Sequence, residues 1–220
     1  MKIGALVSGG KDSLFAAYKA SKEHESVCLI TLKSKNPESY MFHIPNVHLV
    51  ELQAKAIGLP LVFLETEGVK EEELEDLKEA IEIAKEKYRI EGIVSGAIKS
   101  NYQKERVDNI CKELGLKSIA PLWHTNEDLY IKELIKNFNV IIVGIAADGL
   151  KKEMLGMRIG ITFTDRMRSL NVSVIGEGGE YESFVLDCPL FKKSIKIEEF
   201  EIKMEDERTG HYLIKKAVLV

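Results

Sequence analysis

The sequence predicts an α/β protein in which helices cover both faces of a parallel sheet, followed by a smaller α+β region. Short apolar runs alternate with helical patterns as far as residue 122, and this alternation is typical of a parallel sheet. A Ser-Gly-Gly turn separates the first run from the first helical pattern. After Trp123 the segments are longer and glycine-punctuated, and two of them alternate apolar with polar residues, as half-buried strands do.

The hydrophobic pattern predicts the elements of the first region. Strands are expected over residues 3–7, 27–32, 59–64, 93–95 and 118–122, and helices over 13–22, 47–57, 69–88 and 101–114. The second and fourth helices are expected to stop at Gly58 and Gly115. The acidic run 71–73 opens the third helix and is expected to face solvent, favoured by the helix dipole.

The second region is predicted to contain a helix near 129–137 and strands over 140–147, 195–204 and 212–220. Asp148 follows one of these strands and is expected to face the cleft. A boundary near Trp123 to Asn126 divides the chain into residues 1–124 and 125–220.

Composition excludes several classes of protein. The chain has 220 residues, 45% of them hydrophobic, and a net charge of −4, which argues against disorder and against general nucleic-acid binding. The longest stretch without Asp, Glu, Lys or Arg is 39–50, too short for a membrane span. No signal-peptide pattern is present, so we expect a cytoplasmic protein. Three distant cysteines predict neither disulfides nor a zinc site.

The segment 8–13, Ser-Gly-Gly-Lys-Asp-Ser, carries the chemistry. It lies between a strand and a helix, where free N–H groups and the helix dipole favour an anion. Gly9 and Gly10 leave room for a phosphate, and Lys11 adds a positive charge. Asp12 is expected to cap the helix, hold Lys11 or lie near Mg²⁺. The segment is not a Walker loop, which needs Ser or Thr directly after the lysine.

This loop resembles the pyrophosphate-binding loop (PP-loop) of the N-type ATP pyrophosphatases. The resemblance implies an adenine nucleotide alpha hydrolase-like, Rossmann-like fold with a five-stranded parallel sheet. It also implies that ATP is cleaved between its α- and β-phosphates, with Mg²⁺ sharing the charge of the departing pyrophosphate.

Two further segments narrow the resemblance. One is Ser95-Gly96-Ala97-Ile98-Lys99-Ser100, followed by Gln103 and Arg106; the other is Gly176-Glu177-Gly178-Gly179-Glu180-Tyr181-Glu182. Together they resemble the diphthine–ammonia ligase family over nearly the whole chain. This implies an ATP-dependent ligase that adenylates the diphthine carboxylate of elongation factor 2, after which ammonia, drawn from ammonium, displaces AMP.

The resemblance and the motifs together assign candidate site residues. Residues 1–124 are expected to bind ATP, and residues 125–220 to supply substrate-binding and catalytic groups. The candidates are Lys11, Asp12, Glu177 and Glu180 for catalysis; Ser8, Gly9, Gly10, Lys11, Asp12, Ser13, Ser95 and Gly96 for the nucleotide; and Tyr40, Gln103, Arg106, Gly178, Gly179 and Glu182 for the substrate. The clustered acids would suit Mg²⁺, ammonium or a cationic substrate, although no residue is assigned as a resident metal ligand.

Other interpretations stay open at this point. Residues 176–182 also fit a glycine-rich hairpin with solvated acids, and Arg106 also fits a surface cation with a packed stem. A different PP-loop enzyme, acting in tRNA modification or small-molecule amidation, and a non-catalytic ATP or AMP sensor are the alternatives. The oligomeric state is left open, a homo-oligomer included.

Overall fold

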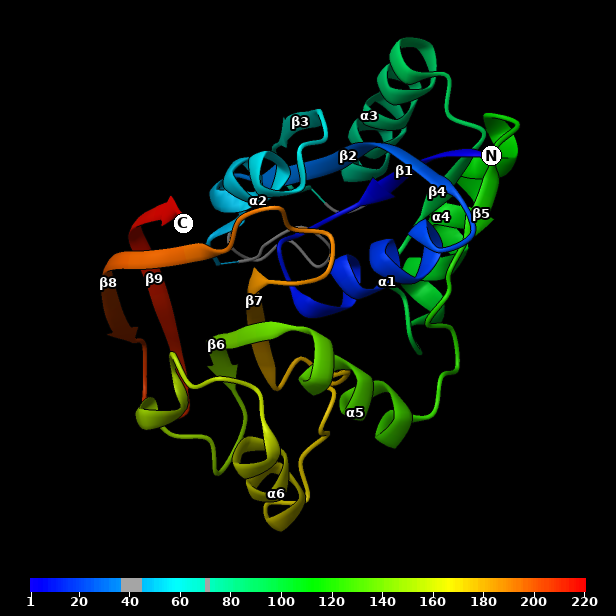
Figure 1. Ribbon diagram of the computed structural model, residues 1–220. Coiled ribbons are helices and arrows are strands. Elements are labelled where there is room, and N and C mark those ends of the chain that lie inside the picture. The colour runs from blue at the N-terminus through cyan, green and yellow to red at the C-terminus, as the bar shows by residue number, and fades with distance from the viewer. Residues whose placement is uncertain (37–44, 70–71) are drawn as a thin grey trace.

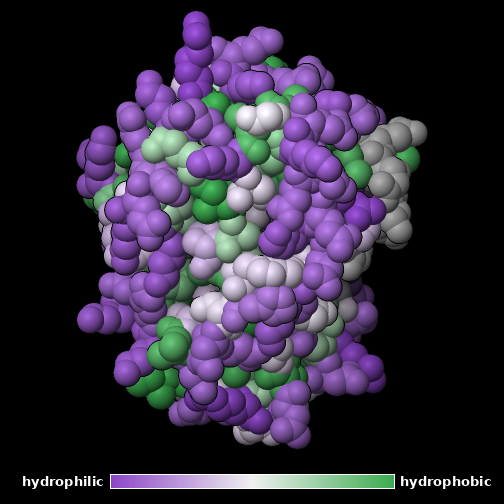
Figure 2. Space-filling view, turned by 90° about the vertical axis from the view of Figure 1, so that its right-hand side faces the viewer, coloured by the Kyte–Doolittle hydropathy of each residue, from purple (hydrophilic) through white to green (hydrophobic). Residues whose placement is uncertain are grey.

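We analysed a computed structural model of the chain, which describes residues 1–36, 45–69 and 72–220. The candidate substrate residue Tyr40 therefore lies outside the described residues. Within them, no helix has the length and apolar character needed to cross a membrane. On the face that Figure 2 displays, hydrophilic side chains predominate and the hydrophobic ones form scattered patches.

A five-stranded parallel sheet forms the first half of the molecule (Figure 1), which confirms the predicted fold class. Its strands are β1 (Lys2–Leu6), β2 (Glu25–Ser34), β3 (Leu61–Thr66), β4 (Gly92–Val94) and β5 (Lys117–Ile119), in the order β3-β2-β1-β4-β5. The chain therefore runs outward from β1 to β3 and then returns to the other side of β1. This reversal leaves a crevice at the carboxyl ends of β1 and β4, where open α/β sheets bind their ligands.

Helices cover both faces of this sheet. They are α1 (Lys11–Ser21), the 3-10 turn η1 (Val47–Leu49) with α2 (Val50–Ile57), α3 (Glu72–Tyr88) and α4 (Asn101–Glu113). Ile3 and Ala5 of β1 share a core with α1 and α2, whereas Cys28 and Ile30 of β2 share the opposite core with α3 and α4. Because β1 and β2 are covered on both faces, their sequences are nearly continuous apolar runs.

Several predicted boundaries need correction. The third helix begins at Glu72 rather than residue 69, and the second starts as the 3-10 turn η1. The fifth strand stops at Ile119 because the following backbone turns, with the Trp123 N–H donating to the Ala120 carbonyl. The predicted end at Gly58 is confirmed, with a left-handed φ of +82°. The expectation that the acidic run 71–73 faces solvent is wrong for Glu73, whose side chain is 1% exposed.

The second half contains an antiparallel sheet in the order β7-β6-β9-β8. Its strands are β6 (Asn139–Ala146), β7 (Tyr181–Asp187), β8 (Ile195–Met204) and β9 (Thr209–Leu219), accompanied by α5 (Glu127–Asn137), the 3-10 turn η2 (Lys152–Met154) and α6 (Ile161–Ser169). The prediction of β8 is confirmed, and β9 begins three residues earlier than predicted. The sequence analysis did not identify β7 or α6.

The two sheets pack around one continuous core. The ring of Phe15 in α1 lies 5.2 Å from Tyr130 of α5 and 5.3 Å from Phe138. Phe184 of β7 belongs to the same core. The predicted division between residues 124 and 125 falls in the connection from one sheet to the other, and it stays a prediction. The three cysteines are unpaired and buried, as small core residues are.

Candidate functional site

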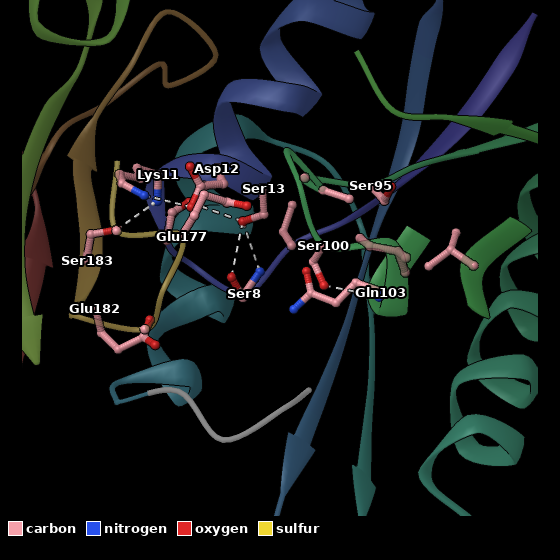
Figure 3. Close-up of a pocket in the computed structure, with 18 of the residues that line it drawn as sticks. Ser8, Lys11, Asp12, Ser13, Ser95, Ser100, Gln103, Glu177, Glu182 and Ser183 are labelled. Atoms are coloured by element: carbon pink, nitrogen blue, oxygen red, sulfur yellow. Dashed lines mark hydrogen bonds and ion pairs between the residues drawn. The ribbon is translucent and has the colours of Figure 1, made fainter. Parts of the chain in front are cut away.

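A cavity of about 530 Å³ opens at the carboxyl ends of β1 and β4. Figure 3 shows Ser8, Lys11, Asp12 and Ser13 gathered at its centre, with Ser95, Ser100 and Gln103 on one side and Glu182 and Ser183 on the other. The cavity is lined by residues of the parallel sheet region and by the segment 176–183. The predicted loop therefore lies in the crevice that the strand order creates.

Ser13 holds the loop closed. Its hydroxyl accepts a hydrogen bond from the Ser8 N–H at 3.2 Å and donates one to the Gly10 carbonyl at 3.1 Å. The two serine hydroxyls are 3.3 Å apart. Gly9 adopts a left-handed φ of +88°, which disfavours any residue with a side chain. The loop is thus bent sharply just before α1 begins.

Hydrogen bonds from β7 and from α2 fix the position of the loop. The Gly9 carbonyl accepts hydrogen bonds from the Val185 N–H at 3.0 Å and from the Gln53 amide at 3.1 Å. The Lys11 N–H donates to the Ser183 hydroxyl at 3.1 Å. Val185 and Ser183 belong to β7, so the antiparallel sheet fixes the position of the loop.

Lys11 is a buried cation at the start of α1. Its side chain is 3% exposed, and its Nζ lies 2.8 Å from an Asp12 carboxylate oxygen. The Tyr130 hydroxyl donates to the other Asp12 oxygen at 2.5 Å. Burial alone would lower the pKa of Lys11, but Asp12, together with Tyr181 and Glu182, outweighs burial and raises it. Lys11 therefore stays charged throughout the physiological pH range.

The end of β4 approaches α1 unusually closely. A Cβ atom at Gly96 would lie 2.8 Å from the Ser13 backbone nitrogen, so only glycine fits here without a shift of the backbone. Ser95 is 7% exposed, and its hydroxyl has no hydrogen-bond partner among the described residues. A buried hydroxyl on a cavity wall is available to a polar group of a ligand.

The cavity walls differ in polarity from one part to another. Apolar side chains at the ends of β1 and β2 and on α3 and α4 line one part: Leu6, Ile30, Leu32, Leu77 and Val107. Serines, the Lys11–Asp12 pair, Glu177, Glu182 and the backbone of the loop line another. The N–H groups at the start of α1, together with Lys11, favour an anion beside the loop, so the cavity suits a ligand with an apolar end and an anionic end.

Comparison with known proteins supplies the family. The description "Diphthamide synthase N-terminal domain" matches residues 1–118, and "Diphthamide synthase C-terminal domain" matches residues 126–220. The chain belongs to the diphthamide synthase family. The resemblance inferred from the three motifs is thereby confirmed.

Relatives agree over most of the chain. The diphthine–ammonia ligase of Rattus norvegicus is 39% identical, covering 91% of this chain and 84% of the rat protein. That of Homo sapiens is 37% identical, covering 92% and 85%. A crystal structure titled as a predicted subunit of tRNA methyltransferase from Methanocaldococcus jannaschii aligns over 86% of this chain and 98% of its own, at 18% identity and a TM-score of 0.43.

Two acids of the glycine-rich segment 176–182, Glu177 and Glu180, accept hydrogen bonds from different backbone groups. Gly176 and Gly179 have positive φ angles of 72° and 77°, which turn the backbone twice. Glu177 accepts a hydrogen bond from the Lys99 N–H at 3.0 Å, whereas Glu180 folds back onto the Gly178 N–H at 2.8 Å. The expected cluster of acids does not form, and the described residues contain no group of three or more His, Cys, Asp or Glu side chains that could hold a metal.

Two of these acids line the cavity, and both have a raised pKa. Burial raises the pKa of Glu182 to about 7; Lys11 opposes this shift and Asp12 adds to it. Burial and the charge of Asp12 also raise the pKa of Glu177. Glu182 is therefore the carboxyl group of the site that changes charge near neutral pH.

The structure brings most, though not all, of the predicted residues to the cavity. Gln103, Gly178 and the remaining serines and glycines of the motifs line it, but Gly9, Glu180 and Arg106 do not. The Arg106 guanidinium lies 3.3 Å from the centre of the Tyr102 ring. Both residues belong to α4, so the guanidinium packs against its own helix. Asp148 pairs with Arg208 at 2.7 Å on the surface, so the expectation that it faces the cleft is wrong.

Sequence reasoning missed two residues that shape the site, Tyr130 and Ser183, and gave no site role to two others, Ser100 and Tyr181, which belong to the motifs it quoted. The Tyr181 ring centre lies 5.2 Å from the Lys11 Nζ, and that of Tyr130 lies 6.0 Å from it. Identifying the strand 181–187 would have indicated Tyr181 and Ser183. No local signal links Tyr130 to Asp12, which is 118 residues away.

Proposed function

We propose that this chain is an ATP-dependent diphthine–ammonia ligase. One observation carries the proposal: Lys11, buried and charged at a helix N-terminus, lies on the wall of a cavity whose other walls include a patch of apolar side chains. A nucleoside triphosphate has this polarity, because its base is apolar on both faces and its phosphates are anionic. The names of the relatives supply the reaction and the acceptor.

The nucleotide is proposed to lie along the cavity. The loop 8–13 binds the β- and γ-phosphates through N–H groups, the hydroxyls of Ser8 and Ser13, and Lys11. The base packs among Ile30, Leu32 and the neighbouring apolar side chains, and the unpartnered hydroxyl of Ser95 bonds the nucleoside. The α-phosphorus then lies between these two ends, facing the segment 176–179.

The proposed reaction has two steps. A diphthine carboxylate oxygen attacks the α-phosphorus, the bond to the bridging oxygen breaks, and pyrophosphate leaves. Ammonia then attacks the acyl carbon of the adenylate, AMP leaves with the electron pair of the broken C–O bond, and one proton is lost from nitrogen. The loop contributes by position and by stabilising the charge that grows on the pyrophosphate.

Mg²⁺ fits this site as a companion of the phosphates. It binds typically through one or two carboxylates, substrate phosphates and water, and Asp12 is the carboxylate beside Lys11. The absence of a three-acid group in the described part of the chain is consistent with this mode. Bound there, the ion would neutralise phosphate charge.

Glu182 is proposed to take the proton from ammonium. It lines the cavity and has a pKa of about 7, closer to the pKa of ammonium than that of an ordinary carboxyl. The smaller difference makes the proton transfer less unfavourable. Glu177 and Glu180, the acids that the sequence favoured, then serve to shape the segment 176–182 through their hydrogen bonds to the Lys99 and Gly178 N–H groups.

Product analysis tests the proposal. The purified chain is incubated with ATP, Mg²⁺, ammonium and elongation factor 2 that carries diphthine. We expect AMP and pyrophosphate in amounts equal to the amide, detected by mass spectrometry of the factor. ADP with orthophosphate, or ATP binding without turnover, would exclude this ligase.

A matched pair of variants connects the result to the loop. Lys11→Met removes the buried charge and should lower the affinity for ATP by about a hundredfold or more, since charged hydrogen bonds contribute about 1.5–3 kcal/mol each. Its affinity for adenosine should hardly change. Lys19→Met, on the same helix and also paired with a carboxylate, should bind both like the wild type.

A further inference from the structure

A second hollow, of about 700 Å³, lies beside the nucleotide cavity. It is bounded by the start of α4, the start of α5 and the segment that follows α6: Lys99, Ser100, Glu127, Asn171, Val172, Ser173, Val174, Glu177 and Gly178. Ser100, Glu177 and Gly178 line both hollows. The two spaces therefore meet at the segment 177–178, and we call the second one the side hollow.

The reaction needs such a second approach. Once ATP fills the first cavity, the acceptor must reach the α-phosphorus from a direction that the nucleotide does not occupy. Figure 3 shows Glu177, the shared wall, beside Asp12 and Ser13 at the loop. The side hollow is also far larger than ammonium needs, since a small molecule the size of water occupies about 30 Å³. Its size suits a long side chain.

The charges of the side hollow favour a cation. Its walls carry two carboxylates, Glu127 and Glu177, against one ammonium group, Lys99, which is bonded to Glu127. The Lys99 N–H holds Glu177 in place at 3.0 Å. Ser100, Asn171 and Ser173 add polar groups without charge. The walls are therefore net negative.

An exposed apolar residue lies on the helix that supplies Glu127. Leu129, two residues after Glu127 on α5, is 67% exposed. A large apolar side chain left in water suits contact with the surface of another protein. It is an observation independent of the hollow's charge.

We infer that the side hollow receives the acceptor: a side chain of a folded partner protein that carries a positive charge close to the carboxylate to be activated. Glu177 and Glu127 bind the positive charge, the carboxylate reaches past Gly178 to the nucleotide, and Leu129 contacts the partner's surface. This inference rests on the proposed function and adds to it the route of the acceptor.

Steady-state kinetics of Glu127→Gln test the inference. We expect the KM for diphthine-bearing elongation factor 2 to rise about tenfold, because a charged contact is lost and Lys99 is left unbalanced. The values of kcat and of KM for ATP should stay within about twofold. Leu129→Ser should raise the same KM and leave that for ATP unchanged.

The control is Glu113→Gln, which breaks another exposed Lys–Glu pair, with Lys78, outside both hollows. It should leave all three constants unchanged. An unchanged acceptor KM in Glu127→Gln, or a rise confined to the KM for ammonium or ATP, would overturn the inference while the ligase activity stands. If the wild type made no amide, the proposed function would fail instead. The affinity of elongation factor 2 for the wild type and for Glu127→Gln would then test the side hollow, and equal affinities would overturn the inference.

Discussion

Lys11 illustrates how a single residue is prepared for its task. A buried ammonium is unfavourable unless it is paired, and its neighbour Asp12 supplies the partner at 2.8 Å. Tyr130 in turn holds Asp12. A carboxylate beside a phosphate site would ordinarily repel the ligand, but here the Lys11 ammonium balances its charge. Asp12 thus keeps Lys11 charged and in place, one of the roles expected from the sequence.

Glu182 gives the site a predicted pH dependence. Its pKa of about 7 means that the carboxyl is mostly protonated below that pH and mostly ionised above it. As a base it works only when ionised, so its contribution should fall about tenfold for each pH unit below 7. Glu182→Gln should lower the amidation rate at pH 8 by about a hundredfold or more.

The amidation rates of the wild type and of Glu182→Gln are measured from pH 5.5 to 8.5 at a fixed total concentration of ammonium, which stays mainly protonated over this range. We expect the wild-type rate to rise with pH and level off above about 7, because it follows the ionised fraction of Glu182, whereas the slower rate of Glu182→Gln should keep rising, because it depends on free ammonia. Identical pH profiles for the two proteins would contradict the role of base. Glu201→Gln, an exposed acid of β8 paired with Lys215, should behave like the wild type throughout.

At the scale of elements, the closest approach in the site is between the end of β4 and the start of α1. The sequence analysis named Gly96 as a candidate for nucleotide binding, and the structure adds that a Cβ there would lie 2.8 Å from the backbone of Ser13. Gly96→Ala should therefore destabilise the protein by about 1–3 kcal/mol, since backbone must move. Urea denaturation measures this change, and ATP affinity should fall with it.

Gly160→Ala is the matched control, because nothing lies within 4 Å of a Cβ at that position and its φ is extended. Its effect should stay within about 0.5 kcal/mol. Equal destabilisation by the two substitutions would show that loss of glycine, rather than the contact between β4 and α1, is responsible.

The elements were predictable where one pattern dominated. Apolar runs identified the central strands β1, β2 and β4 because these strands are largely buried, and Gly58 marked the end of α2. In β7, however, the acids of residues 180 and 182 adjoin a glycine-rich turn, so the segment resembled a loop. α6 is short and carries Asp165, Arg166 and Arg168, and its buried side chains, including Phe163 and Met167, are too few for a clear helical stripe.

At the scale of the whole molecule, Asn46 joins the two halves. It is 6% exposed, its amide donates to the Tyr212 carbonyl at 2.9 Å, and its carbonyl oxygen accepts from the Ile214 N–H at 2.8 Å. Asn46→Ala leaves both β9 groups without partners and should cost about 2–4 kcal/mol. Urea unfolding followed by circular dichroism and Trp123 fluorescence should remain a single transition, because the core is continuous.

Asn171→Ala provides the comparison, since Asn171 has a similar left-handed φ of 53°, against 67° for Asn46, but is exposed. Subtracting its effect removes the cost of placing alanine in that conformation. If Asn46→Ala lowered the free energy of unfolding no more than Asn171→Ala does, the result would argue against a stabilising role for the two Asn46 hydrogen bonds. Two separate transitions in the wild type would argue against the shared core.

The sequence by itself determined the fold class and the place of the phosphate loop, because a strand, a glycine turn and a helix follow one another directly between residues 2 and 21. Only the tertiary structure decided which side chains surround Lys11. Tyr130, Tyr181 and Ser183 come from distant segments, and their arrival depends on how the antiparallel sheet packs against α1. It also decided that Glu177 and Glu182 line the cavity whereas Glu180 does not, since Glu180 folds back onto the Gly178 N–H within the turn.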